Sequence, residues 1–124
     1  MVNILCIDNS KTIRQVLKDC VLDLGYGFFE AENGKVGIEV AEEIENLRMV
    51  IIDWNMPVMS GKETLSYFRA TEKYKDSLIL VLIRIENKEE VMRAIDMGAN
   101  MYILKPFSVN NLQDKIEEMI KNAG

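Results

Sequence analysis

The sequence predicts a doubly wound α/β domain, a five-stranded parallel sheet with helices on both faces. Short apolar runs alternate five times with stretches whose apolar residues recur at helical spacing. Because a helix between two strands normally returns the chain to start a parallel neighbour, this alternation favours a parallel sheet. A closed barrel of this kind needs eight strands, so we expect an open sheet. The length of 124 residues suits one domain over 1–124.

The first half of the chain contains two strand–helix units. Val2 to Ile7 is a short apolar run, and the helical pattern after it begins at Ser10, which can cap a helix, and ends near Gly25. The second strand is predicted at Tyr26 to Ala31, and Asn33-Gly34 opens a second helix. The apolar face of that helix is predicted to contain Val36, Val40, Ala41, Ile44 and Leu47.

The middle of the chain contains the third unit and the most apolar strand. Met49 to Ile52 is a strand that ends at Asp53, and Ser60 with Glu63 forms a capping box that opens a third helix. Leu78 to Ile83 is apolar without interruption, which is typical of a central strand covered on both faces. This segment is therefore predicted to be the most deeply buried strand.

Two further units complete the chain. Asn87 is expected to cap a fourth helix that ends near Gly98, and Met101 to Leu104 is the fifth strand. Helical spacing from Val109 to Ile120 predicts the last helix. Four methionines of this region are expected to fill the core: Met92, Met97, Met101 and Met119.

Composition excludes several classes of function. Fifteen basic and 20 acidic residues leave a net charge of −5, which argues against direct nucleic-acid binding. The chain has no histidine, so imidazole-based triads and histidine metal sites are excluded. Cys6 and Cys20 fall in apolar stretches without metal or redox spacing and are expected to be reduced core thiols. With no membrane-spanning run or signal peptide, we expect a cytoplasmic protein with no membrane contact.

Three charged residues follow predicted strands, namely Asp8, Asp53 and Lys105. Ligands of open parallel sheets bind outside the carboxyl ends of the strands, so we expect these groups to converge there. Two neighbouring carboxylates repel unless a cation intervenes, and Mg²⁺ prefers oxygen ligands. The side chain of Asn9 and the main-chain carbonyl of Asn55 would complete the oxygen shell. Such a site suits a phosphoryl group.

Three segments carry a family resemblance: Ile7-Asp8-Asn9-Ser10, Asp53-Trp54-Asn55-Met56-Pro57 with Gly61, and Lys105-Pro106-Phe107. At these separations they resemble the receiver domains of two-component response regulators. The resemblance covers the whole chain, and Asp53 to Pro57 is most similar to the stand-alone chemotaxis type. It implies a flavodoxin-like three-layer sandwich with strand order 2-1-3-4-5. That order places the first and third strands side by side and brings Asp8 next to Asp53.

The resemblance also implies a phosphoryl-transfer chemistry. Asp53 is expected to accept a phosphoryl group from a histidine kinase or phosphotransfer protein, and Lys105, before a cis proline peptide, is expected to contact that group. The implied Mg²⁺ ligands are Asp8, Asn9, Asp53 and Asn55. A chain of this kind phosphorylates itself, slowly hydrolyses its own acyl phosphate and turns over no external substrate. It signals by changing which downstream protein target it binds.

Three positions depart from the family pattern. Asn9 stands where receivers usually carry a second acid that binds the metal directly, so weaker Mg²⁺ binding is expected. Ile83 stands where a Ser or Thr hydroxyl usually bonds the phosphoryl oxygen. Arg84 replaces a small residue. Its guanidinium either binds phosphate in place of the hydroxyl, or pairs with Asp53, or lies at the surface.

Other residues keep two interpretations open. Tyr102 resembles the aromatic residue that receivers rotate inward on activation, and the alternative is a half-buried strand tyrosine. Trp54 and Met56 are either functional or a cover for the loop beside Asp53. Because of Asn9 and Ile83, the alternative function is a degenerate receiver that acts as a phosphorylation-independent protein-interaction module.

Overall fold

A single parallel sheet with the strand order β2-β1-β3-β4-β5 organises the computed structural model, which describes residues 1–123. The strands are β1 (Asn3–Ile7), β2 (Gly27–Ala31), β3 (Leu47–Asp53), β4 (Leu78–Arg84) and β5 (Met101–Lys105). Every neighbouring pair is parallel. The predicted fold class and strand order are confirmed.

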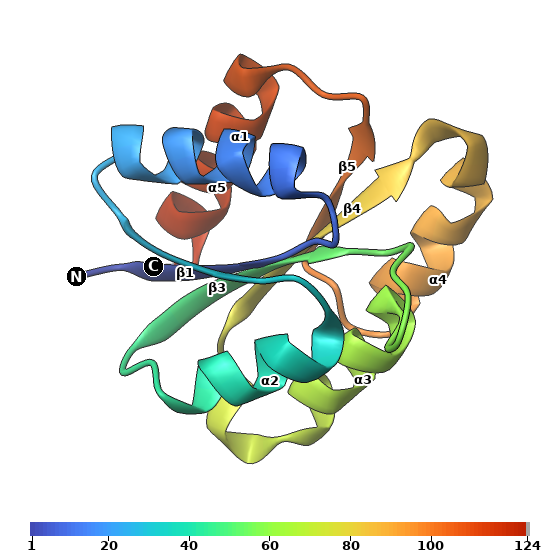
Figure 1. Ribbon diagram of the computed structural model, residues 1–124, viewed down its shortest axis with the longest axis horizontal. Coiled ribbons are helices and arrows are strands. Elements are labelled where there is room, and N and C mark those ends of the chain that lie inside the picture. The colour runs from blue at the N-terminus through green and yellow to red at the C-terminus, as the bar shows by residue number, and fades with distance from the viewer. Residues whose placement is uncertain (124) are drawn as a thin grey trace.

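Helices cover both faces of the sheet. They are α1 (Lys11–Asp23), α2 (Gly34–Glu42), α3 (Gly61–Ala70), α4 (Val91–Asp96) and α5 (Val109–Asn122), with short 3₁₀ segments η1 (Glu72–Tyr74) and η2 (Ile85–Glu90). Helices α1 and α5 lie on one face, here called the α1/α5 face, and α2, α3 and α4 lie on the other, the α2–α4 face (Figure 1). This is the three-layer sandwich that the alternation of strands and helices predicts.

Alternation along each strand divides the core between the two faces. On β4 the side chains at positions 78, 80 and 82 pack with the α1/α5 layer, and those at 79, 81 and 83 pack with the α2–α4 layer. All six are buried, as predicted, although β3 is the central strand and β4 lies between it and β5. Because successive side chains of a strand point to opposite faces, this parity also decides on which face each strand-end residue lies.

The predicted starts of the helices that follow the loops after β1 and β3 are confirmed in detail. The hydroxyl of Ser10 caps α1, and Ser60 and Glu63 form the predicted capping box at the start of α3. Gly61 packs so closely on the end of β3 that an added Cβ would lie 2.5 Å from the carbonyl oxygen of Asp53. The first turn of α3 is therefore held directly against the loop that follows Asp53.

The predicted second helix is too long. Helix α2 ends at Glu42, whereas Ile44 lies in the turn and Leu47 opens β3. Asn46 adopts a positive φ of 57°, a left-handed conformation that reverses the chain. Ile44 is still buried, because the turn folds its side chain back onto the core, and this continued the helical pattern past the real end of the helix.

The predicted cap of the fourth helix is wrong. Helix α4 begins at Val91, and its N-cap residue Glu90 makes no side-chain cap hydrogen bond. Asn87 lies inside η2 with non-helical dihedral angles, φ −110° and ψ 26°. Its side-chain amide instead donates a hydrogen bond to Oδ1 of Asn55, in the loop that follows β3.

Among the predicted core residues, one is misplaced. Met92 is 66% exposed on α4, so the prediction that it fills the core is wrong. Met119 is buried, and Met97 and Met101 are half-buried against the core. Both cysteines are buried free thiols, as predicted. Within residues 1–123, no helix has the length and apolar character needed to cross a bilayer.

Candidate functional site

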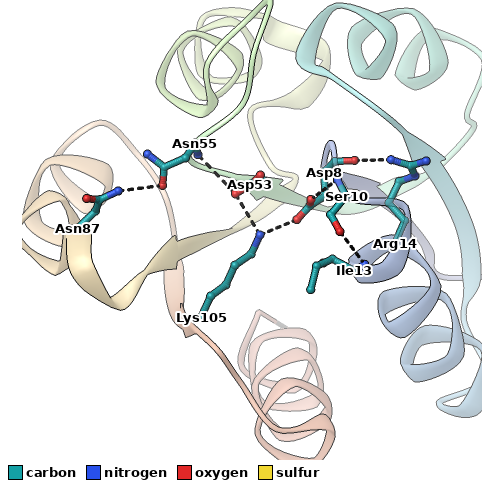
Figure 2. A network of polar contacts seen from close by, with 8 residues as sticks. All are labelled: Asp8, Ser10, Ile13, Arg14, Asp53, Asn55, Asn87 and Lys105. Atoms are coloured by element: carbon teal, nitrogen blue, oxygen red, sulfur yellow. Dashed lines mark hydrogen bonds and ion pairs between the residues drawn. The ribbon is translucent and has the colours of Figure 1, made fainter.

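A lysine and two aspartates meet at the carboxyl ends of the strands. The ammonium of Lys105 lies 2.9 Å from Oδ2 of Asp8 and 3.2 Å from Oδ1 of Asp53 (Figure 2). Asp8 follows β1, Asp53 ends β3 and Lys105 ends β5. The Lys105–Pro106 peptide bond is cis, as the resemblance implied. The structure thus brings together the three charged groups that the strand ends predicted.

Strand parity explains why the three side chains share one face. Asp8, Asp53 and Lys105 each lie two residues beyond a side chain of the α1/α5 layer. Those preceding side chains are Cys6, Ile51 and Ile103. A spacing of two residues along a strand returns to the same face, so all three charged groups are directed to one side of the sheet edge.

Asp8 is fully buried and held on three sides. Its Oδ1 accepts a hydrogen bond of 2.8 Å from the main-chain N–H of Ser10, while Oδ2 faces Lys105. Its main-chain carbonyl accepts from the guanidinium of Arg14 at 2.7 Å, and Arg14 also pairs with Glu30. The carboxylate therefore has a fixed position at the start of α1, as Figure 2 shows.

Asp53 is only 2% exposed, and its environment disfavours the ionised form. Burial raises the pKa of the Asp53 carboxyl, and the neighbouring charge of Asp8 raises it further. Lys105 and the main-chain N–H of Asn55 oppose this rise of the pKa without cancelling it. The single ammonium of Lys105 contacts both carboxylates, so the three groups keep a net negative charge when all of them are ionised.

A chain of amide hydrogen bonds extends the site to the next loop. The N–H of Asn55 donates to Asp53 Oδ1 at 3.4 Å, and the side-chain amide of Asn87 donates to Oδ1 of Asn55 at 3.2 Å (Figure 2). This contact joins the loop after β3 to η2. Sequence reasoning missed Asn87 as a site residue, because an asparagine three residues before a glutamate resembles a helix cap.

The three departures from the family pattern lie in different places. Asn9 is exposed and directly follows the buried Asp8. Ile83 is fully buried on the α2–α4 face and contributes no polar atom to the site. Arg84 is the last residue of β4 and is exposed. Its guanidinium forms no ion pair with Asp53, which removes that interpretation for the structure described here.

The aromatic residues and Met56 pack around the site rather than inside it. Trp54 is 5% exposed and belongs to the core of the α2–α4 face, and Met56 is half-buried against that core. Both therefore cover the loop beside Asp53. Tyr102 is half-buried on β5 and packs against the same core.

The donors present suit a hard cation. The carboxylates of Asp8 and Asp53 meet at this site, and Asn9 and Asn55, which follow them closely in the chain, carry further amide and carbonyl oxygen atoms. Oxygen ligands with excess negative charge fit Mg²⁺ better than a transition metal. Across residues 1–123 no group of three His, Cys, Asp or Glu side chains is arranged to hold a metal. A cation at this site would thus rely on two acids and neutral oxygens.

Comparison with known proteins agrees with this geometry. The sequence model of the response regulator receiver domain family matches residues 4–117. The chain belongs to this family. The receiver is 36% identical over 118 residues to a chemotaxis protein CheY homolog of Campylobacter jejuni, covering 94% of this chain and 91% of the relative. It is 31% identical over 121 residues to the chemotaxis protein CheY of Pseudomonas aeruginosa, covering 97% of both chains.

Solved structures confirm the fold of this receiver. The chemotaxis response regulator CheY4 of Vibrio cholerae superimposes with a TM-score of 0.88 at 30% identity, covering 95% of this chain and 98% of the other. The family and the CheY-like fold inferred from the three sequence segments are therefore confirmed. The receiver differs from the family pattern at positions 9, 83 and 84, which directly follow Asp8 or end β4.

Proposed function

We propose that Asp53 of this receiver accepts a phosphoryl group from a histidine kinase or a phosphotransfer protein. The arrangement that carries the proposal is the ammonium of Lys105 held between the carboxylates of Asp8 and Asp53. A carboxylate nucleophile needs a nearby cation to screen it from the incoming phosphoryl oxygens. Lys105 is positioned to contact those oxygens after transfer, because it already lies 3.2 Å from Asp53.

The transfer exchanges one bond to phosphorus for another. A carboxylate oxygen of Asp53 forms an O–P bond as the N–P bond of the phosphohistidine breaks, and a neutral imidazole leaves with a proton on its other nitrogen. The acyl phosphate is lost slowly by hydrolysis: water attacks phosphorus, the O–P bond to Asp53 breaks, and inorganic phosphate and a proton are released. The receiver turns over no external substrate in this scheme, so its product is the phosphorylated protein itself.

We assign the proposed Mg²⁺ ligands to Asp8, Asn9, Asp53 and the main-chain carbonyl of Asn55. When bound, Mg²⁺ would screen the negative charge that the carboxylates and the phosphoryl oxygens share. The raised pKa of Asp53 supports the assignment, because burial and then the nearby charge of Asp8 disfavour its ionised form, which a bound cation would favour. Asn9 offers a neutral oxygen instead of a carboxylate, so we expect weak affinity for the metal.

We further propose that residues 1–124 act as one cytoplasmic signalling unit whose downstream protein target binds it differently after phosphorylation. The two buried free thiols support a reducing compartment. Ile83, Arg84 and Tyr102 are the candidate switch residues, since they end β4 or lie on β5 beside it. Added charge on Asp53 would bias the arrangement of this edge of the sheet.

Phosphorylation by acetyl phosphate tests the proposal directly. With Mg²⁺ present, the intact mass should rise by about 80 Da for one phosphoryl group as acetate leaves. Asp53→Asn should abolish the gain, whereas Asp76→Asn, at an exposed aspartate outside the site, should retain it. An unchanged mass of the wild-type chain at millimolar metal would count against phosphorylation of Asp53.

Two observations favour a second candidate, a phosphorylation-independent protein-interaction module. Ile83 is fully buried without a hydroxyl, and Asn9 lacks the charge of a carboxylate. Titration of Mg²⁺ with beryllofluoride, a phosphoryl analogue, separates the two candidates. Trp54, next to Asp53 and 5% exposed, is the only tryptophan and reports on the loop by its fluorescence. A saturable change supports the phosphoacceptor, and no response supports the module.

A further inference from the structure

Arg84 is a cation at the edge of the site that the proposed chemistry has not yet used. It is the last residue of β4, and its side chain is exposed. Within residues 1–123 its guanidinium takes part in no ion pair. The charge is therefore available to a ligand without the loss of an existing contact.

Strand parity places Arg84 on the same face as the charged cluster. The preceding residues of that parity on β4, Leu80 and Leu82, pack into the α1/α5 layer, and Arg84 continues their alternation. Ile83 has the opposite parity and packs into the α2–α4 layer. At the end of β4, the residue directed to the face of Asp53 is thus Arg84.

The sheet register places Arg84 on the strand between Asp53, which would carry the phosphoryl group, and Lys105, which would contact it. Strand β4 lies between β3 and β5, and the register pairs Arg84 with Lys105 and Asp53 with Leu82. With ordinary strand spacing and rise, the Cα of Arg84 lies about 8 Å from that of Asp53, against about 12 Å for Lys105. Lys105 spans the longer separation to within 3.2 Å of Asp53. Arg84, with a side chain of similar length, starts from the nearer strand.

The charge balance of the site supplies the reason for a second protein cation. Two carboxylates share one ammonium before any transfer. A phosphoryl group on Asp53 carries a charge of about −2, so it deepens the deficit. Ile83 has no donor to offer. A guanidinium presents a planar pair of N–H donors that matches two phosphoryl oxygens.

We propose that Arg84 binds the phosphoryl group on Asp53 through its guanidinium, beside Lys105 and in place of a donor at position 83. The inference rests on the proposed function, because it names a further contact of the same phosphoryl group. It assigns Arg84 a role in recognising the anion rather than the metal. Loss of its charge should therefore weaken phosphoryl-analogue binding and spare Mg²⁺ binding.

Beryllofluoride titrations at saturating Mg²⁺, followed by Trp54 fluorescence, test the assignment. Arg84→Ala should weaken the apparent affinity about tenfold, as expected for loss of a charge-assisted contact. Arg84→Lys, which keeps the charge but not the planar fork, should fall between this variant and wild type. Lys88→Ala removes an exposed charge from η2 and should change the affinity by less than about twofold. Mg²⁺ binding without beryllofluoride should be as tight in Arg84→Ala as in wild type, or tighter.

The outcomes separate this inference from the proposal on which it rests. If wild type binds beryllofluoride and Arg84→Ala binds it within about twofold, Arg84 does not contact the phosphoryl group while the phosphoacceptor role stands. An equal loss in Lys88→Ala would also overturn the assignment, because it would show a general electrostatic effect. If wild type itself takes up neither beryllofluoride nor a phosphoryl group, both proposals fail. Circular dichroism of each variant confirms that the comparison is between folded proteins.

Discussion

The ammonium of Lys105 lies 3.2 Å from the carboxylate of Asp53, although 52 positions separate the two residues in the sequence. The same ammonium contacts Asp8, so a single cation lies between two buried carboxylates. Such an arrangement makes the lysine a stabilising residue, in addition to the phosphoryl contact proposed for it above. Its removal leaves two adjacent negative charges that water barely reaches.

We expect Lys105→Met to lower the free energy of unfolding by about 3 kcal/mol near neutral pH, because breaking a buried charge pair leaves an uncompensated charge. Urea denaturation measures this change. Lys121→Met, at an exposed position of α5, is the control and should stay within about 0.5 kcal/mol of wild type. A loss for Lys105→Met as small as that of the control would show that the ammonium contributes nothing to stability.

Asp53→Asn should stabilise the protein near neutral pH in metal-free buffer. Burial and the charge of Asp8 raise the pKa of Asp53 in the folded state, so folding is favoured while this carboxyl is protonated. That contribution is fully present below the unfolded pKa and is lost as the pH rises through the folded pKa. The asparagine removes the ionised group, and we expect a gain of about 1 kcal/mol, or about 4 °C in Tm.

The pH dependence provides the check on this prediction. The difference in Tm between Asp53→Asn and wild type should be largest near neutral pH and should vanish below about pH 4, where the carboxyl is protonated in both states. Thermal unfolding followed by circular dichroism across this range measures it. A difference that stays constant with pH would attribute the gain to packing instead of charge.

Asp8 should respond differently to two substitutions. Asp8→Asn removes the charge that repels Asp53 but keeps an oxygen for the N–H of Ser10, so we expect unchanged or higher stability without metal. Asp8→Ala also removes the acceptor of that N–H and should be about 1 kcal/mol less stable than Asp8→Asn. Thermal unfolding of the pair measures the difference. Equal stabilities would mean that the contact to Ser10 has no energetic weight.

Asn87→Ala should loosen the loop that follows β3. The substitution removes the hydrogen bond that joins η2 to Asn55, at a cost of about 1 kcal/mol in unfolding free energy. Faster hydrogen exchange at the Asn55 amide, which faces Asp53, should accompany the loss. Lys88→Ala changes a neighbouring exposed residue of η2 and should leave that exchange rate unaltered. Unchanged exchange in Asn87→Ala would show that Asn55 is held by its own loop alone.

Several features of the site could be predicted because they follow from strand ends. Asp8, Asp53 and Lys105 stand directly after or at the ends of apolar runs, and parallel strands present their carboxyl ends at one edge. The contact between Asn55 and Asn87 could not be predicted, because it joins two loops that only the packed sheet brings together. Ile44 and Leu47 extended a helical pattern that a left-handed turn at residue 46 interrupts.

A half-buried arginine shows the same limit far from the site. Arg69 donates to the carbonyls of Gly98 and Ser77 and to the side chain of Asn100, at 2.7, 3.0 and 2.7 Å respectively. Burial lowers the pKa of its guanidinium. In the sequence it is an ordinary helical arginine near the end of α3, so its role in joining that helix to the loops around β4 and β5 has no local signal.

The sequence by itself determined the succession of strands and helices along the chain and the polar residues at the strand ends. Apolar periodicity and helix caps, which predict them, are local properties. Tertiary structure alone decided the rest: that Lys105 bridges two carboxylates, that Asn87 reaches Asn55, and that Arg84 stays exposed. Those outcomes depend on sheet register, strand parity and burial. They arise only when segments distant in the chain are packed against one another, because water is then excluded and side chains from different strands share one edge.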